Sequence, residues 1–212
     1  MSTEHHVRFQ MDARFVSEGV PDAQVLWICL HGYAQLAPYF IKKFSSLFAS
    51  HQVIVPEGLH RFYMNDGSGR VVASWMTKED RECDIKNYLA YLDEVLKSVL
   101  NQRKSAPNEI RILGFSQGVA TACRFYAHTK LPISRLLLWA GALPPDLDLR
   151  AMRIKKTHAQ IILLTGDEDP YMKEGAYDSS EQVLNELHIP FEQRSFTGGH
   201  EIKEEVLKSL ID

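Results

Sequence analysis

The chain has few cysteines and no sequence pattern typical of a disulfide-stabilised or metal-binding protein. Its 212 residues include three cysteines, Cys29, Cys83 and Cys123, which are scattered and form no C-x-x-C pair. An odd number at irregular spacing argues against the disulfide framework of small secreted domains, so we expect three buried thiols. The sequence also lacks an H-E-x-x-H motif, a Cys/His cluster and a phosphate-binding glycine fingerprint. It therefore predicts that no metal or organic cofactor is needed.

Charge of one sign and long apolar runs are also missing. The 24 basic and 27 acidic residues leave a formal charge of −3, so we expect no nucleic-acid partner. The longest apolar runs, such as residues 136–143, are far shorter than the roughly 20 residues that span a bilayer, so no membrane span is predicted. Residues 1–6 lack the basic and apolar parts of a signal peptide. These features favour a cytoplasmic protein with a small-molecule partner, and they carry no prediction of its oligomeric state.

No linker, internal repeat or low-complexity tract divides the chain. Hydrophobic residues make up 45% of the sequence and charged residues 24%, which is typical of a globular protein with a sizeable core. A chain of this length fits one domain of ordinary size. We therefore predict a single domain over residues 1–212.

Short apolar runs alternate with segments of helical periodicity along the sequence. Residues 7–15 alternate apolar and polar side chains, which predicts an antiparallel edge strand with one solvent-facing side, and residues 58–75 indicate a hairpin. Further strands are predicted at residues 25–30, 53–56, 110–113, 136–139, 161–164 and 191–196, and helices at 38–50, 80–102, 116–129, 177–188 and 200–211. This alternation predicts an α/β fold with a mostly parallel sheet and helices on both faces.

Residues 110–120 carry the pattern of a nucleophile elbow. An apolar run leads through Gly114 to Ser116 and Gly118, and then into small residues with helical character. In a G-x-S-x-G elbow, a sharp strand-to-helix turn exposes the serine hydroxyl, and the two glycines avoid collisions between strand and helix. The alternative is an ordinary turn in which Ser116 caps the helix. The strand before it and the helix after it favour the elbow.

A catalytic serine needs a base, and two histidines follow predicted strands. Ligands bind beyond the carboxyl ends of the strands in this class of sheet, which selects His31 and His200 among nine histidines. His200 follows two glycines on the last strand-to-helix turn, from where an imidazole can reach another strand end. We therefore expect His200 to be the base that activates Ser116.

A histidine base in turn needs an acid that orients it and stabilises its charge, which completes a catalytic triad. Several carboxylates lie where this acid is expected. Asp167, Glu168 and Asp169 follow a predicted strand between the serine and the histidine. We favour Asp169, because Pro170 has a fixed φ and no N–H and would present the preceding side chain on an open turn. Asp167 is more simply a turn residue that caps backbone amides. The weaker alternatives, after the preceding strand, are Asp146 and Asp148.

Two backbone amides are candidates for an oxyanion hole. Negative charge that develops on a substrate oxygen needs donors that are already in place. The amide of Gln117 follows the nucleophile at the start of a helix, and the amide of Tyr33 follows His31 and Gly32 at the end of a strand. The alternative for the second segment is a tight turn, which would need only the glycine.

Four motifs together resemble a known family. They are His31-Gly32, Gly-Phe-Ser-Gln-Gly at residues 114–118, Gly-Asp-x-Asp-Pro at 166–170 and Gly-Gly-His at 198–200. This set resembles the small carboxylesterase, phospholipase and acyl-protein thioesterase family of α/β-hydrolases, over residues 25–212. The resemblance implies an α/β-hydrolase fold and a triad. Its members would be Ser116 as nucleophile, Asp169 as acid and His200 as base, with the amides of Tyr33 and Gln117 as the oxyanion hole.

The chain also departs from that family near the substrate. After His31-Gly32, acyl-protein thioesterases typically continue with Gly-Asp, whereas this sequence has Tyr33-Ala34-Gln35. The predicted hairpin is more aromatic than in the family, and no inserted segment is long enough for a large lid, so we expect an open site. Ordinary packing is the alternative role for the aromatic and methionine residues that could line an acyl pocket. These are Phe62, Tyr63, Met64, Trp75, Met76, Tyr171 and Met172.

The leading functional hypothesis is hydrolysis of small to medium-chain carboxylic esters through an acyl-enzyme. A second hypothesis is thioesterase or lysophospholipase activity on lipidated substrates, which the resemblance implies. A third is a ligand-binding module that retains the scaffold without catalysis. The third would be expected to lack a triad member, and none is missing here.

Overall fold

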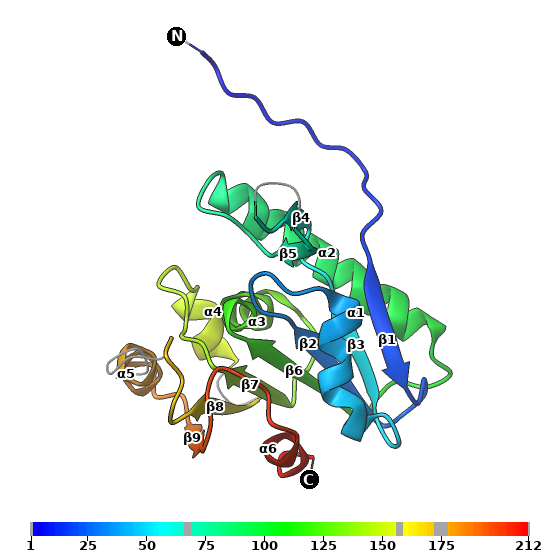
Figure 1. The fold of residues 1–212 in the computed structure, drawn as a ribbon, viewed down its shortest axis with the longest axis vertical. Coiled ribbons are helices and arrows are strands. Elements are labelled where there is room, and N and C mark those ends of the chain that lie inside the picture. The colour runs from blue at the N-terminus through cyan, green and yellow to red at the C-terminus, as the bar shows by residue number, and fades with distance from the viewer. Residues whose placement is uncertain (1, 66–68, 156–158, 172–177, 212) are drawn as a thin grey trace.

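The central feature of the fold is a seven-stranded sheet in the order β1-β3-β2-β6-β7-β8-β9 (Figure 1). The computed structural model describes residues 2–65, 69–155, 159–171 and 178–211. The strands of this sheet are β1 (Phe15–Gly19), β2 (Val25–Leu30), β3 (Gln52–Pro56), β6 (Glu109–Phe115), β7 (Arg135–Trp139), β8 (Gln160–Gly166) and β9 (Phe191–Phe196). All neighbouring pairs are parallel except β1 with β3. The carboxyl ends of six strands therefore meet at one edge.

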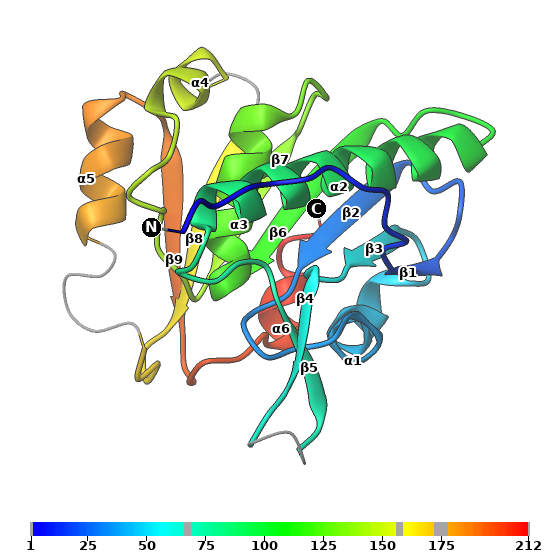
Figure 2. The ribbon, with the colours of Figure 1, turned by 90° about the horizontal axis from the view of Figure 1, so that it is seen from above.

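Helices cover both faces of this sheet (Figure 2). They are α1 (Ala37–Phe40), the 3-10 helix η1 (Ile41–Leu47), α2 (Arg81–Gln102), α3 (Gln117–His128), α4 (Leu149–Ile154), α5 (Asp178–Glu186) and α6 (Glu204–Lys208). Residues of α2, α3, α4 and α5 share one buried core, and residues of α1, η1 and α6 share the other. Along β2, Leu26 and Ile28 belong to the first core and Trp27 and Cys29 to the second. A strand covered on both faces needs such a continuous apolar run, and the predicted α/β architecture is confirmed.

The predicted hairpin is present beside the sheet. Strands β4 (His60–Tyr63) and β5 (Val71–Ser74) pair antiparallel as a separate two-stranded unit. The hairpin projects from the body of the protein near α1 (Figure 2). Gln35 forms an isolated bridge with Ala73, so the hairpin is tied to the loop that follows β2. No large lid covers this edge of the described structure.

The prediction of an edge strand over residues 7–15 is wrong for most of that segment. Strand β1 begins at Phe15, and the side chains of Val7 and Phe9 are 85% and 78% exposed. Its partner β3 ends at Pro56, which pairs with Phe15, and the last backbone bond beyond that pair runs from the Glu57 amide to the Arg14 carbonyl. Earlier residues have no strand beside them, so alternation alone does not place them in the sheet.

Three smaller predictions also need correction. The helix expected over residues 38–50 is a single turn of α1 followed by the tighter η1, and the one expected over 200–211 is limited to α6. Helix α4 was not predicted. Cys29 and Cys123 are buried as expected, whereas Cys83 is only partly buried on α2.

Within the described residues, no helix is both long and apolar enough to cross a membrane.

Candidate active site

Ser116 lies on a strained turn between β6 and α3. Its backbone has φ +54° and ψ −118°, outside the regions that side chains normally favour. Gly114 and Gly118 are required by space, because a Cβ on either would lie within 2.4 Å of backbone oxygen. Ser116 is the N-cap residue of α3, yet its side chain makes no capping hydrogen bond. The geometry is therefore that of an elbow with an available hydroxyl, and the alternative of an ordinary N-cap is wrong.

The structure brings Asp169 and His200 together. Nδ1 of His200 lies 2.7 Å from Oδ2 of Asp169, whose side chain is fully buried. The other oxygen of Asp169 accepts a hydrogen bond from the Tyr171 amide at 2.9 Å. Because Nδ1 faces a carboxylate, it carries the proton, and Nε2 of a neutral His200 is left as the basic atom.

The ring of His200 lies beside the elbow. It contacts the ring of Phe115, the residue before Ser116, at a centroid distance of 4.9 Å, and the ring of Tyr171 at 4.7 Å. No hydrogen bond joins the Ser116 hydroxyl to His200 among the described residues. Catalytic hydrogen bonds are often long without substrate and tighten when it binds. The three predicted triad residues therefore converge at one edge of the sheet.

The other candidate acids are occupied elsewhere. Asp167 accepts a hydrogen bond from the Gly198 amide at 2.9 Å, in the turn-capping role that was the alternative for it. Asp146 binds Arg124 and Arg81 at 2.6 and 2.7 Å. Asp148 caps α4 by accepting from the Ala151 amide, and Glu168 is exposed. Among the described carboxylates, Asp169 is the one bonded to His200.

His31 fixes the direction of the peptide that follows β2. Its Nε2 accepts a hydrogen bond from the Gly58 amide at 2.9 Å, so its Nδ1 must carry the proton that is donated to the Gly32 carbonyl at 2.7 Å. Burial lowers the pKa of His31, which keeps the ring neutral at neutral pH. The Gly32 carbonyl and the Tyr33 amide belong to one trans peptide and point in opposite directions. By holding the carbonyl, the ring turns the Tyr33 N–H away from itself.

The loop containing Gly32 lies against the elbow. A Cβ on Gly32 would lie 3.2 Å from the Ser116 Cβ and 3.4 Å from the Gln35 Oε1. The same Gln35 oxygen accepts a hydrogen bond from the Gly32 amide at 2.9 Å. Two side-chain contacts, from His31 and Gln35, therefore fix both sides of Gly32 next to the serine.

The two amides proposed for an oxyanion hole flank Ser116. Within the described residues, neither the Tyr33 nor the Gln117 amide donates a hydrogen bond to the protein. The Gln117 side chain is instead fixed in place: its Nε2 donates to the Ser74 hydroxyl at 2.9 Å, and its Oε1 accepts from the Trp75 amide at 3.2 Å. Both amides thus lack a partner among the described residues, and side-chain contacts hold the segments that carry them in place.

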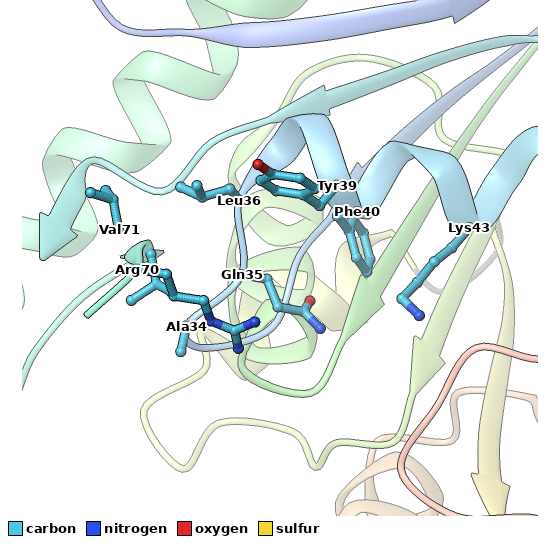
Figure 3. Close-up of a pocket in the computed structure, with 9 residues that line it drawn as sticks. Ala34, Gln35, Leu36, Tyr39, Phe40, Lys43, Arg70 and Val71 are labelled. Carbon is cyan, nitrogen blue, oxygen red and sulfur yellow. The ribbon is translucent and has the colours of Figure 1, made fainter. Parts of the chain in front are cut away.

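A cavity of about 550 Å³ opens beside this loop (Figure 3). It lies between α1, η1 and β5. The residues that line it are Ala34, Gln35, Leu36, Tyr39, Phe40, Lys43, Arg70, Val71 and Val72. Gln35 connects the wall of this cavity to the site, because its side chain also accepts the hydrogen bond from Gly32, the residue packed against Ser116.

The structure does not gather the predicted acyl-pocket residues around this cavity. Trp75 is fully buried, with its Nε1 donating to the His31 carbonyl at 2.8 Å, so it is a core residue. Tyr63 and Tyr171 are 60% and 74% exposed. Phe62 contacts the ring of Tyr33 at 5.4 Å. The remaining members are Met64 and Met76, which are partly buried, and Met172, which lies outside the described residues.

Several residues that shape the site carry no clear sequence signal. Gln35, Ser74 and the Gln117 side chain act through contacts between segments far apart in the chain, and the lining residues Lys43 and Arg70 come from η1 and the hairpin. The sequence places His31 at a strand end, but its ring contacts depend on Gly58 and Gly32 together.

Comparison with known proteins identifies the family of the chain and structures with a similar fold. The sequence model of the family described as phospholipase/carboxylesterase matches residues 11–212. Similar solved structures include esterase PE8, at 19% identity and TM-score 0.68, covering 95% of this chain and 96% of that one. Acyl-protein thioesterase 2 of Zea mays has 17% identity and TM-score 0.71, covering 94% and 96%. A phospholipase/carboxylesterase of Dyadobacter fermentans has 16% identity and TM-score 0.65, covering 97% of both chains. No curated protein matches the chain.

Proposed function

The chain belongs to the phospholipase/carboxylesterase family of hydrolases, and from that premise we propose that it hydrolyses carboxylic esters through an acyl-enzyme formed on Ser116. The observation that carries the proposal is the hydrogen bond of 2.7 Å between the buried Asp169 and His200. This histidine lies beside Ser116, which has a strained backbone and a side chain that makes no capping hydrogen bond. A nucleophile, a base and an acid at three strand ends are what acyl transfer to serine requires.

In the proposed first step, the Ser116 oxygen attacks the ester carbonyl while Nε2 of His200 takes the hydroxyl proton. Asp169 stabilises the imidazolium that forms, through its contact with Nδ1. The tetrahedral oxyanion is held by the N–H groups of Tyr33 and Gln117. His200 then gives its proton to the leaving alcohol oxygen as the carbon–oxygen bond breaks, which leaves an acyl-enzyme.

In the proposed second step, water repeats this chemistry on the acyl-enzyme. His200 takes a proton from the water as its oxygen attacks the acyl carbon, and returns the proton to Ser116 when the carboxylic acid leaves. The same residues would act on a thioester, which differs in its leaving group. Thioesterase or lysophospholipase activity is therefore the second candidate, supported by the family.

The test combines labelling and turnover. We expect wild-type protein to react with a fluorophosphonate, losing fluoride as Ser116 forms a bond to phosphorus, and to give an acyl burst with a chromogenic ester. Ser116→Ala should lose both, whereas Ser45→Ala, which changes an exposed serine on η1, should retain both. Labelling and turnover that persist in Ser116→Ala would overturn the assignment. Ligand binding with no burst in the wild type would favour a non-catalytic module.

Esters and thioesters of graded chain length separate the two catalytic candidates. Small and medium-chain carboxylic esters should be the better substrates. Turnover restricted to long-chain thioesters would replace the first candidate by the second.

A further inference from the structure

The cavity beside the loop after β2 is lined by two cationic side chains and no acidic one. Lys43 on η1 and Arg70 before β5 are the charged members of the nine lining residues. In Figure 3 their charged groups lie on either side of Gln35, which comes from the loop between them. A third basic residue, Lys42, places its Nζ 5.6 Å above the ring of Tyr39, another lining residue. The cavity is thus locally positive in a protein whose formal charge is −3.

These two cations have no counter-ion in the described part of the chain. Neither Lys43 nor Arg70 forms an ion pair or a side-chain hydrogen bond with another described residue. The buried carboxylate at this end of α1, Glu57, is already occupied by Arg14, Arg61 and the Ala37 amide. Both side chains are exposed. A cavity lined by two cations and no acid attracts an anion, and a guanidinium can hold a carboxylate or phosphate through two parallel hydrogen bonds.

The cavity lies on the side of Ser116 that faces away from His200. It is built from the loop after β2, from α1 and η1 and from β5, whereas His200 follows β9 at the opposite end of the strand order. Figure 1 places α1 and β9 on opposite sides of β6, the strand that leads to Ser116. Since His200 must protonate the leaving oxygen, the leaving alcohol belongs on its side. The cavity beside Gly32 and Gln35 is then left for the acyl part.

From this arrangement we propose that the preferred substrates carry an anionic group, a carboxylate or phosphate, on the acyl part of the ester, bound by Arg70 with Lys43 beside it. The inference rests on the proposed esterase function and specifies its substrate class. An uncharged fatty acyl chain fits this cavity less well, because its methylenes would remove water from an ammonium and a guanidinium without replacing their hydrogen bonds. Phe40 and Val72, which are buried, contribute an apolar wall suited to a short hydrocarbon spacer.

The first test compares two esters of the same shape. Phenyl hemisuccinate carries a carboxylate where phenyl 4-methylpentanoate carries an isopropyl group, and both release phenol. We expect kcat/KM to favour the hemisuccinate by about tenfold or more, and this preference to shrink as salt is added. The phenyl ester of 3-phosphonopropionate, compared in parallel, distinguishes a phosphate-type group from a carboxylate. Equal or faster turnover of the neutral ester would overturn the inference.

The second test assigns the preference to the cavity. Arg70→Gln should lower the ratio of kcat/KM for the two esters by about tenfold, and Lys43→Gln by a smaller factor, about threefold. Arg150→Gln, which changes an exposed arginine on α4, is the matched control and should leave the ratio as in the wild type. An equal loss for both esters in Arg70→Gln would contradict a role in charge recognition.

A binding measurement separates failure of this inference from failure of the proposed function. Titration calorimetry of the wild type with succinate and with inorganic phosphate should show binding of at least one anion, weakened in Arg70→Gln. If Ser116 turns over neutral esters and no anion binds, the inference fails and the esterase function stands. If no ester is hydrolysed but anion binding depends on Arg70, the esterase proposal fails and the cavity is an anion site. No anion binding and no preference would refute the inference outright.

Discussion

The elbow at residues 114–118 and the N-terminal segment, residues 2–12, both carry regular patterns in the sequence, but only the elbow is fixed by its surroundings in the structure. At the elbow, the neighbouring backbone at the end of β2 enforces the local pattern: a Cβ on Gly118 would meet the Leu30 and His31 oxygens at 2.2 and 2.7 Å. In the N-terminal segment, no strand lies beside the alternating residues, and Val7 and Phe9 are exposed. A sequence pattern determines structure where the surrounding chain leaves no other arrangement.

The contacts of the N-terminal segment are few and lie at the surface. The buried Glu57 carboxylate binds Arg14, beyond this segment, whereas Nε2 of His6 lies 2.7 Å from the Asp80 carboxylate at the surface, at the start of α2. Exposed polar contacts of this kind contribute little to stability. Changes at the elbow and its partners should therefore have large effects, and changes in the N-terminal segment small ones.

The largest effect is expected where three strand ends converge. Asp169→Asn should lower kcat for ester hydrolysis by about 10⁴-fold, because an amide no longer holds the required tautomer of His200 or balances its charge. Thermal unfolding should show that the fold is retained. Asp167→Asn is the matched control: its carboxylate caps the Gly198 amide, and we expect a loss of less than about tenfold. Equal losses in the two variants would contradict the assignment of Asp169.

The next effect tests the steric constraint at the elbow. In Gly118→Ala, the new methyl group would collide with the Leu30 carbonyl oxygen, so β6 and α3 must move away from β2. Overpacking of this kind costs about 1–3 kcal/mol, which lowers Tm by roughly 2–12 °C in a protein of this size, and displaced Ser116 should lose activity.

Gly199→Ala is the matched control for that change. Its added Cβ would lie 3.9 Å from the Glu168 carbonyl oxygen, an ordinary contact. We expect its Tm to stay near that of the wild type. If both variants unfolded at the wild-type temperature, the elbow would be as tolerant as the N-terminal segment, and the contrast between them would fail.

The same difference explains which parts of the fold and the site could be predicted from the sequence. The elbow, His200 and the favoured Asp169 follow from short motifs at strand ends, whose positions are set by sheet topology. The cavity forms where η1 and the hairpin meet the loop after β2. The sequence of any one of these segments does not indicate that contact. Trp75 shows why the pocket could not be predicted in the same way. Its aromatic side chain suggested a pocket residue, but it is buried against the ring of His31.

An intermediate effect is expected at Asp146, which links two helices. Burial alone would raise the pKa of this carboxyl, but hydrogen bonds from Arg124 and Arg81 outweigh it and lower the pKa to about 2. A lowered pKa stabilises the fold above the unfolded value, near pH 4, and this contribution is lost as pH falls toward 2. Asp146→Asn should therefore cost about 1–2 kcal/mol at pH 7, allowing for partial exposure.

Denaturant unfolding at several pH values measures that contribution. The difference between wild type and Asp146→Asn should shrink between pH 4 and pH 2. Asp148→Asn is a suitable control, because asparagine caps a helix as well as aspartate does and the Ala151 amide keeps an acceptor. A pH-independent difference would attribute the loss to packing rather than to the ion pairs.

The smallest effect is expected from deletion of residues 2–12. With their apolar side chains exposed and β1 intact from Phe15, kcat should stay at the wild-type value and Tm should fall by less than about 2 °C. The contact with Asp80 raises the pKa of His6, so any stabilisation by that pair is present below the ordinary histidine pKa and lost as pH rises through the raised value. A loss comparable to that of Gly118→Ala, measured by thermal unfolding at pH 5.5 and 8, would mean that the alternating residues pack after all. The elbow would then no longer differ from the N-terminal segment in how strongly its surroundings constrain it.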